Sequence, residues 1–161
     1  MPEALDPREL EAYFALMEAV SLLQHGVEQQ LRAEGDISSV QFQLLARLAQ
    51  GPLTMTQLAD GVVYSRSGLT YQAGLLEKAG LVTRRPSDDD DRATLVTITE
   101  KGRRLVGHVL PGHVEVARRL LFDPLSDDDV VRLGDIFTRV RDHNRALPPR
   151  SAKPRKRQAP R

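Results

Sequence analysis

Residues 55–102 read MTQLADGVVYSRSGLTYQAGLLEKAGLVTRRPSDDDDRATLVTITEKG, and they contain the most informative pattern of helix and strand signals in the chain. It opens with the pattern of a short helix that ends at Gly61. Ser65 is a favourable N-cap for a second helix over about residues 66–79, and Gly80 stands where that helix should stop. Two helices joined by so short a connection predict a helix-turn-helix.

The remainder of this stretch has the pattern of a β-hairpin. Residues 81–85 and 95–99 are β-branched, roughly alternating runs, and the turn-rich residues 86–91 separate them. Two short strands around an exposed loop form a wing beside the helix pair. Residues 54–99 therefore predict a winged helix-turn-helix module.

The second helix of the pair has two different faces. An α-helix that enters the major groove of DNA must bury one face and keep small and polar side chains on the other. Leu69, Ala73 and Leu76 are predicted to point inward. The outward positions are Arg66, Ser67, Thr70, Tyr71, Gln72 and Gly74, and Ser67, Gly68 and Gly74 are small enough to let the DNA backbone approach closely.

Helical patterns flank the module on both sides. Apolar residues at steps of three and four predict a long helix over residues 8–34 and a second helix over residues 39–50. Helix formers return over residues 100–121, where the Pro-Gly pair at 111–112 should bend or interrupt the helix. Ser126, followed by three acids, caps a last helix whose pattern ends at the Pro-Pro pair.

Length and composition narrow the class of protein. A chain of 161 residues fits one ordinary domain of roughly 100–200 residues. The absence of Cys excludes disulfides, thiolate nucleophiles, Cys-ligated zinc and a thiol redox switch. Because the sequence shows neither a long apolar run nor a signal-peptide pattern, we expect a soluble cytoplasmic protein without a membrane partner.

Charge is distributed unevenly along the chain. The formal net charge is +1, yet residues 145–161 carry seven basic side chains and no acid. The preceding part holds 16 basic and 22 acidic side chains, a net of −6 with His neutral. An acidic body with a basic arm is typical of a solvated domain with an interaction tail. The basic arm either tethers DNA without sequence preference or has little effect on DNA binding, and the second interpretation is favoured.

The stretch from Met55 to Gly102 resembles the MarR family of transcriptional regulators. Three features carry the resemblance: the small-residue recognition helix, the exit Leu-Glu-Lys-x-Gly-Leu-Val at 76–82, and the wing motif Asp-x-Arg-Ala at 90–93. The flanking helices are also similar to those of the family in order and length. The resemblance implies a sequence-specific DNA-binding regulator, most often a repressor, and no enzyme.

The resemblance also implies roles for individual residues. The DNA-contacting face would comprise Ser65, Arg66, Ser67, Thr70, Tyr71 and Gln72. Arg92 would reach the minor groove from the wing, and Asp90 would orient a neighbouring cation, for which Arg84 is the candidate. One departure is Asp91, at a position that is often basic in the family. Together with Asp88 and Asp89, it should repel phosphate and leave Arg92 partly paired within the protein.

Family members are dimers held by their terminal helices, which implies a mainly α fold: a winged helix-turn-helix with a β-hairpin wing, flanked by N- and C-terminal dimerisation helices. The expected parts are N-terminal helices (1–50), the DNA-binding module (51–102), C-terminal dimerisation helices (103–147) and a basic disordered tail (148–161). Such a homodimer would bind double-stranded DNA at a palindrome with half-sites roughly 34–36 Å apart.

The resemblance further implies a small, often aromatic or anionic effector that lowers DNA affinity. No motif fixes the pocket residues. His25, between Leu23 and Val27, could line such a cleft, but a polar residue at the edge of a dimer helix is the favoured reading. No cofactor is expected.

The same residues bear on other classes of function. His108 and His113 are five apart, not the four that would place two imidazoles on one helical face, so a zinc site is disfavoured. The acid run at 88–91 is more typical of a solvated loop than of a cation site. A hydrolase is disfavoured because no nucleophile and base are paired. The alternative is a winged-helix protein-interaction module that has lost specific DNA binding, suggested by the acidic wing.

Overall fold

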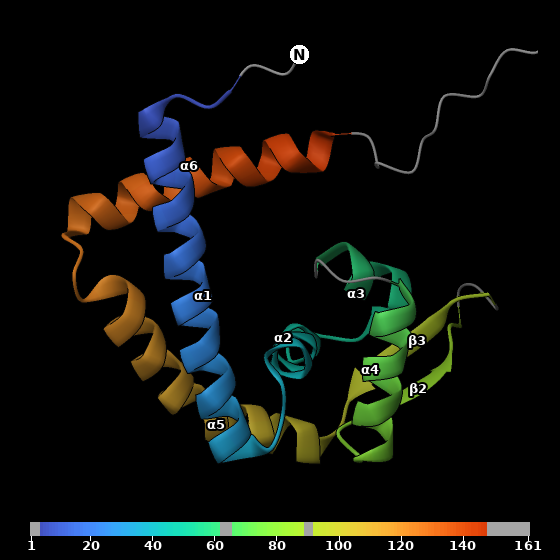
Figure 1. Ribbon diagram of the computed structural model, residues 1–161. Helices are drawn as coiled ribbons and strands as arrows, with labels where there is room; N and C mark the ends of the chain where they lie inside the picture. Colours follow the sequence, from blue (N-terminus) through green and yellow to red (C-terminus); the bar gives the residue numbers. More distant parts are fainter. Residues whose placement is uncertain (1–3, 62–65, 89–91, 148–161) are drawn as a thin grey trace, which may run out of the picture. The chain divides into compact units, whose positions relative to one another are not determined.

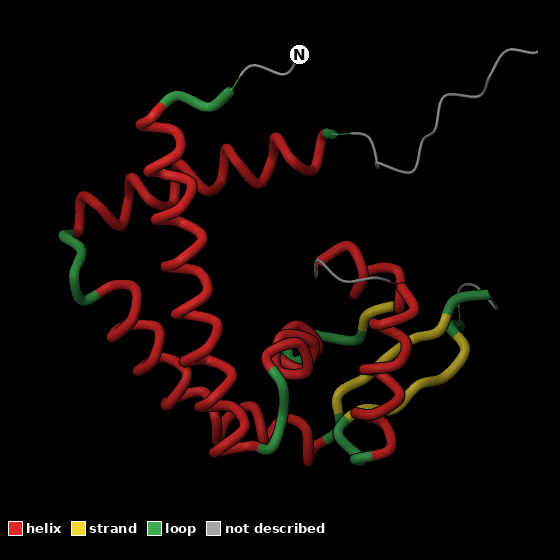
Figure 2. The backbone as a smooth tube through the Cα atoms, viewed as in Figure 1, coloured by secondary structure: helices red, strands yellow, loops and turns green. Residues whose placement is uncertain are grey.

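The computed structural model describes residues 4–61, 66–88 and 92–147, and the chain divides into two units, residues 1–121 and 122–161 (Figures 1 and 2). The first unit contains the strands and most of the helices. The helices are α1 (Pro7–Gly35), α2 (Ser39–Leu48), α3 (Met55–Gly61), α4 (Arg66–Lys78), α5 (Glu100–Ala117), the π-helical segment η1 (Arg118–Phe122) and α6 (Asp127–Ala146). The strands are β1 (Leu53–Thr54), β2 (Val82–Pro86) and β3 (Thr94–Ile98). The predicted mainly helical winged fold is therefore confirmed.

Reciprocal caps set where several helices begin. The Ser38 hydroxyl accepts a hydrogen bond from the Gln41 N–H at 3.2 Å, while the Gln41 side chain accepts one from the Ser38 N–H at 3.0 Å. Ser126 and Asp129 form the same capping box at the start of α6. Each cap satisfies backbone donors that the first helical turn leaves without a partner. The sequence located both helix starts correctly for this reason.

The wing is a three-stranded antiparallel sheet in the order β1-β3-β2. Val82 pairs with Ile98 and Arg84 with Val96 across the predicted hairpin. The third strand, β1, was not predicted: Leu53 lies opposite Val96 along the other edge of β3. Two residues are too few to show the alternation by which a strand is recognised in a sequence.

Helix α5 is not interrupted at its proline. Pro111 lies inside the helix, which runs on to Ala117, and Figure 1 shows its axis turning along the way. Of the two expected outcomes, a bend or an interruption, the structure shows the bend. Val109 and Val116 are buried on either side of the proline, so tertiary packing outweighs the missing hydrogen bond, a penalty of about 3 kcal/mol.

A single apolar core joins the long helices to the winged module within the first unit. Leucines supplied by α1 and α2 meet side chains from α3, α4, the sheet and α5. Its most enclosed members are Leu31, Leu44, Leu45, Leu48, Leu58, Leu69, Leu76, Val82, Val96 and Val109. Because α4 contributes to the same core as α1 and α5, the orientation of α4 depends on that of the long helices.

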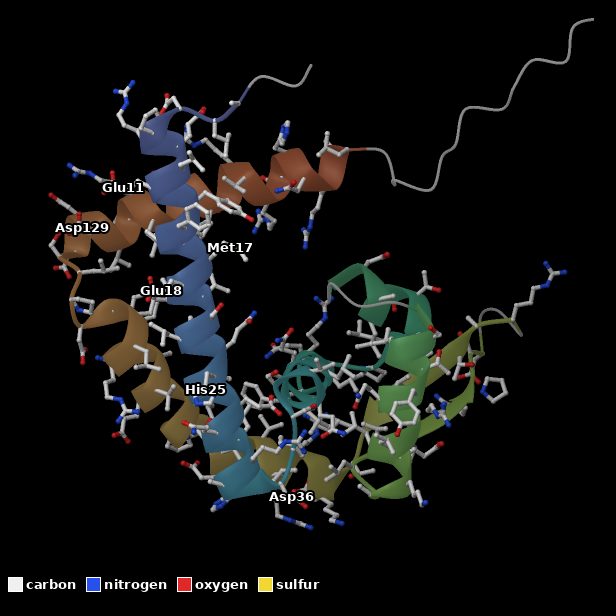
Figure 3. The ribbon with its side chains drawn as sticks, viewed as in Figure 1. Glu11, Met17, Glu18, His25, Asp36 and Asp129 are labelled. Carbon is white, nitrogen blue, oxygen red and sulfur yellow. The ribbon has the colours of Figure 1, made fainter. Side chains whose placement is uncertain are left out.

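Large apolar side chains remain exposed on α1 and α6. On α1 they include Tyr13, Phe14 and Met17, and on α6 they include Ile136 and Phe137. Figure 3 shows Met17 and Glu18 pointing to different sides of α1, as an amphipathic helix requires. Within the described ranges, no helix combines the length and apolar character needed to cross a membrane.

The first turn of α5 is clamped against the turn that follows α4. The Thr99 hydroxyl donates to the Gly80 carbonyl at 2.7 Å, and the Lys101 ammonium donates to the Ala79 carbonyl at 2.8 Å. Gly102 permits this approach, because a Cβ there would collide with the Leu81 carbonyl oxygen and lie 2.7 Å from Ile98 Cγ1. The absence of a side chain at Gly102 therefore lets α5 start against the wing.

Two Gly→Ala substitutions on α5 should have opposite effects on stability. Gly102→Ala should lower the free energy of unfolding by about 1–3 kcal/mol, because backbone and core must shift to admit the methyl group. Gly107 has nothing near its would-be Cβ, so Gly107→Ala should raise it by roughly 0.5–1 kcal/mol. Chemical denaturation measures the free energy of unfolding of both variants. Equal changes in the two would show that the packing around Gly102 can accept a methyl group.

Candidate nucleic-acid interface and ligand pocket

Helix α4 is held by one face. Leu69, Ala73 and Leu76 are each at most 2% exposed, and α4 packs against α2, α3 and β2. The opposite face is therefore directed away from the core. This arrangement is the one that the helical pattern predicted.

Three of the predicted contact positions lie on the outward face of α4. Ser67, Thr70 and Tyr71 are exposed, and Tyr71 reaches 65% exposure although it is a large aromatic residue. Arg66 is the first residue of α4, but its side chain and the whole of Ser65 lie outside the described residues. An exposed tyrosine among small polar residues suits contact with a polar partner and not a protein core.

Gln72 and Gly74 are half-buried and therefore less exposed than predicted. The Gln72 Oε1 atom is buried without a hydrogen-bond partner, so its carboxamide is turned from solvent. A Cβ on Gly74 would lie 3.8 Å from Arg84 Nη2, which places Gly74 beside the wing. Both lie toward the edges of the exposed face, where a helical pattern alone separates inward from outward poorly.

A carboxylate-guanidinium pair joins α4 to β2. Arg84 donates from its backbone N–H to Glu77 Oε1 at 3.1 Å, and from Nε and Nη2 to Glu77 Oε2 at 2.9 and 2.7 Å. The hydrogen bonds from Arg84 lower the pKa of Glu77. The sequence offered Asp90 as the partner of Arg84, but Asp90 lies outside the described residues. Among the described residues, Arg84 pairs with Glu77. Two residues seven apart on different elements leave no local signal of such a pair.

The described part of the wing carries opposite charges. Arg85 and Asp88 form an exposed ion pair at 3.4 Å, and Arg92 is exposed on the strand side of the loop. Asp89 and Asp91 lie outside the described residues. Asp88 is thus at least partly neutralised, which reduces the repulsion of phosphate expected from the acid run.

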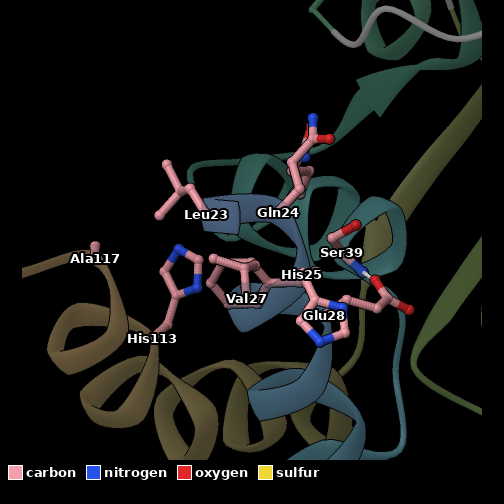
Figure 4. Close-up of a pocket in the computed structure, with 10 residues that line it drawn as sticks. Leu23, Gln24, His25, Val27, Glu28, Ser39, His113 and Ala117 are labelled. Atoms are coloured by element: carbon pink, nitrogen blue, oxygen red, sulfur yellow. Dashed lines mark hydrogen bonds between the residues drawn. The ribbon is translucent and has the colours of Figure 1, made fainter. Parts of the chain in front are cut away.

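A pocket of about 660 Å³ opens between α1, α2 and α5 (Figure 4). Apolar atoms form most of its surface, although six of the ten lining residues also carry a polar group. The lining residues are Leu23, Gln24, His25, Val27 and Glu28 from α1, Ser39, Phe42 and Gln43 from α2, and His113 and Ala117 from α5. His25 thus lines the pocket. The other lining residues had no sequence signal, because they come from three helices far apart in the chain.

His113 is the distinctive polar group of this pocket. Its ring lies 4.5 Å from that of Phe42, between centroids, and its Nδ1 atom is buried without a hydrogen-bond partner. Burial lowers the pKa of His113, so the imidazole is neutral near pH 7. A neutral imidazole on an apolar wall is suited to hydrogen bonding with a ligand.

Glu28 lines the pocket and also binds the first residue of α2. Its carboxylate accepts the Ser39 N–H at 2.7 Å and pairs with Arg32 at 2.9 Å. Burial would raise the pKa of Glu28, but the hydrogen bonds from Ser39 and Arg32 outweigh burial and lower the pKa. Glu28 is therefore ionised at neutral pH.

No group of three His, Asp or Glu side chains in the described ranges could hold a metal ion.

Comparisons with known proteins agree with this architecture. The family model described as MarR family matches residues 36–93. The MarR-family regulator Sco3205 of Streptomyces coelicolor, solved in complex with DNA, is 30% identical, with a TM-score of 0.85 over 89% of this chain and 91% of that chain. The chain belongs to the MarR family.

Other MarR-family and related regulators give the same result. AbsC of Streptomyces coelicolor is 27% identical, with a TM-score of 0.85 over 90% of this chain and 99% of that chain. The HTH-type transcriptional regulator PecS of Dickeya dadantii is 29% identical over 77% of this chain and 76% of its own. This MarR-family chain is thus a transcriptional regulator by descent and fold.

The Glu77–Arg84 pair should position the recognition helix relative to the wing. Glu77→Gln should weaken DNA binding by roughly two- to fivefold, as expected for a partly exposed ion pair, while circular dichroism stays unchanged. Fluorescence anisotropy with a labelled duplex measures the effect. Glu100→Gln, which breaks the exposed pair with Arg104, is the matched control; an equal loss in both variants would refute a positioning role.

Proposed function

We propose that this MarR-family regulator binds a palindromic operator as a homodimer, represses transcription there, and releases the DNA when a small molecule occupies the pocket between α1, α2 and α5. The observation that carries the proposal is the two-faced α4: an apolar face in the core and exposed Ser67, Thr70 and Tyr71 on the other side. Its relative Sco3205 was solved in complex with DNA.

The proposed DNA-contacting residues remain those of the recognition helix and wing. They are Ser65, Arg66, Ser67, Thr70, Tyr71, Gln72 and Arg92, with Arg84 as a residue that positions the wing. Gln72 would have to turn its carboxamide outward to reach a base. We assign the protein to the cytoplasm, where its DNA lies, and we assign it no enzymatic activity, because the relatives are regulators.

Exposed apolar stripes on the terminal helices support a homodimer. Tyr13, Phe14 and Met17 on α1, with Ile136 and Phe137 on α6, leave large apolar surfaces in water when the chain is alone. Exposed apolar side chains in such number on one helix are typical of an interface. A second copy would bury it and pair the two recognition helices about a two-fold axis.

The pocket supports a ligand response. Its walls come from α1, α2 and α5, and α2 packs against α4. A ligand that fits better when these helices are spread would favour a dimer whose recognition helices no longer match successive major grooves. The coupling free energy between ligand and DNA then equals the difference between the free energies with which the ligand binds the two dimer geometries.

DNA binding should depend on the outward face of α4. On a duplex selected from a randomised pool, Arg66→Ala and Tyr71→Ala should each weaken binding by about tenfold or more. Binding of the wild type should also fall steeply with salt, because phosphate contacts release counterions. Arg8→Ala, whose side chain is 93% exposed at the start of α1, should change nothing. Unchanged affinity in both α4 variants would contradict the assignment of this face to DNA contact.

The dimer should dissociate when charge enters the apolar stripe. Phe14 is 62% exposed in the single chain, so Phe14→Glu should leave the fold intact and bury a carboxylate only in the dimer, a strong penalty. Sedimentation velocity should show a monomer, with operator affinity lost in parallel. Arg8→Ala again serves as the surface control, and a dimeric Phe14→Glu variant would contradict the interface.

A further inference from the structure

We propose that the basic arm, residues 145–161, binds the phosphate backbone of DNA and supplies a large part of the protein's sequence-independent attraction to DNA. This inference rests on the proposed DNA binding and adds a second contacting segment to the recognition helix and wing. The sequence alone favoured an arm with little effect on DNA binding. The ion pairs that the structure shows in the DNA-binding module lead to the opposite interpretation.

The DNA-binding module itself is poor in positive charge. Residues 51–102 contain six basic and seven acidic side chains, a net charge of −1. Proteins that bind DNA neutralise phosphates with Lys and Arg, and this attraction supplies essentially all of their sequence-independent binding. A module that is slightly negative does not attract a polyanion at a distance, so the attraction has to come from another part of the chain.

The cations of strand β2 are already paired within the protein. Arg84 donates from Nε and Nη2 to the Glu77 carboxylate at 2.9 and 2.7 Å, and Arg85 pairs with Asp88 at 3.4 Å. To neutralise a phosphate, each guanidinium would have to leave its carboxylate or bring that carboxylate close to DNA. Strand β2 therefore adds little net positive charge to the surface that meets DNA.

The basic arm carries the positive charge that the module lacks. The residues before it have a net charge of −6, so the body of the protein repels DNA. The arm contains no acid, and its basic residues are Arg145, Arg150, Lys153, Arg155, Lys156, Arg157 and Arg161. In the proposed homodimer this charge is present twice, and the attraction between protein and DNA depends on it.

The end of α6 explains only the beginning of this run of charge. Cations in the last turn of a helix are stabilised by the partial negative charge at its C-terminus, an effect that fades beyond that turn. Helix α6 ends at Ala146, so its dipole accounts for Arg145. It does not account for the segment KPRKR at residues 153–157, which begins seven residues later. Short segments rich in Lys and Arg are typical of nucleic-acid contacts.

Covalent attachment to the DNA-binding module favours DNA as the partner of the arm. Fourteen residues follow Leu147, and a chain of this length can span at most about 50 Å. This span exceeds one helical turn of a duplex, roughly 34–36 Å. A duplex that the recognition helices hold presents its phosphates to the arm at a high effective concentration, whereas any other polyanion would have to compete from solution.

Neutralisation of the arm in the full-length protein tests the proposal. The arm variant combines Lys153→Gln, Arg155→Gln, Lys156→Gln and Arg157→Gln. Fluorescence anisotropy on the selected duplex between about 50 and 200 mM KCl gives the slope of log affinity against log salt. We expect the slope to become shallower by about 3–7, because each lost phosphate contact removes about 0.9 and the dimer loses eight charges. Affinity at the lowest salt concentration should fall at least about tenfold.

The preference for the selected duplex over a scrambled duplex should change by less than about twofold in the arm variant, because phosphate contacts carry no sequence information. A rescue variant returns the four charges with the side chains exchanged: Lys153→Arg, Arg155→Lys, Lys156→Arg and Arg157→Lys. It should restore the wild-type slope. A body variant, Arg8→Gln with Arg104→Gln, removes two exposed charges outside the arm and should change the slope by less than about one.

Three results would overturn the proposal: a change of slope in the arm variant no larger than in the body variant, tighter DNA binding by the arm variant, or a rescue variant that behaves like the arm variant. Tighter binding would show that the arm covers the protein's own DNA-binding surface. Circular dichroism melting of each variant checks that it is folded like the wild type.

Failure of this inference and failure of the proposed function give different results. If the wild type prefers its selected palindrome but the arm variant keeps the same slope, operator recognition stands and the role of the arm is overturned. If the wild type binds all duplexes alike, with a steep salt dependence that the arm variant loses, DNA binding by the arm stands and the proposed operator recognition fails.

Discussion

The burial of one face of α4 is the constraint on which the functional surface depends. Leu69, Ala73 and Leu76 enter the same core as the leucines of α2 and the wing residues Val82 and Val96. This burial fixes the rotation of α4 about its axis, so Thr70 and Tyr71 are directed outward. The geometry offered to DNA is thus a consequence of packing on the opposite side of the helix.

Two further contacts determine how α4 relates to its neighbours. Glu77 and Arg84 tie its second half to β2, and Gly102 lets the first turn of α5 lie against the Leu81 carbonyl just after α4 ends. Because α5 also lines the ligand pocket through His113, a single helix connects the pocket to the turn beneath the recognition helix.

The sequence predicted those features that local chemistry determines. The capping pair of Ser38 with Gln41, and that of Ser126 with Asp129, involve residues three apart, so the helix starts could be read directly. The inward face of α4 followed from its helical period. The sequence left open whether Pro111 bends or interrupts its helix, and the helix continues because the buried side chains on both sides of the proline outweigh the local preference against it.

The remaining features depend on contacts between distant segments. Strand β1 forms because the edge of β3 offers hydrogen-bonding partners to the backbone at Leu53. Arg84 pairs with Glu77 because β2 lies beside α4. The pocket collects side chains from three helices, so His113 and Glu28 carried no recognisable motif. The inward turn of the Gln72 carboxamide likewise depends on its surroundings and not on its position in the helical period.

The hydroxyl-radical footprint of the wild-type protein on its selected duplex shows whether two recognition helices bind side by side along the DNA. If two copies of α4 enter successive major grooves, the footprint will show two protected regions related by a dyad, with centres roughly 10 base pairs apart. A single protected region, or diffuse protection along the whole duplex, would contradict the two-fold recognition on which this account is built.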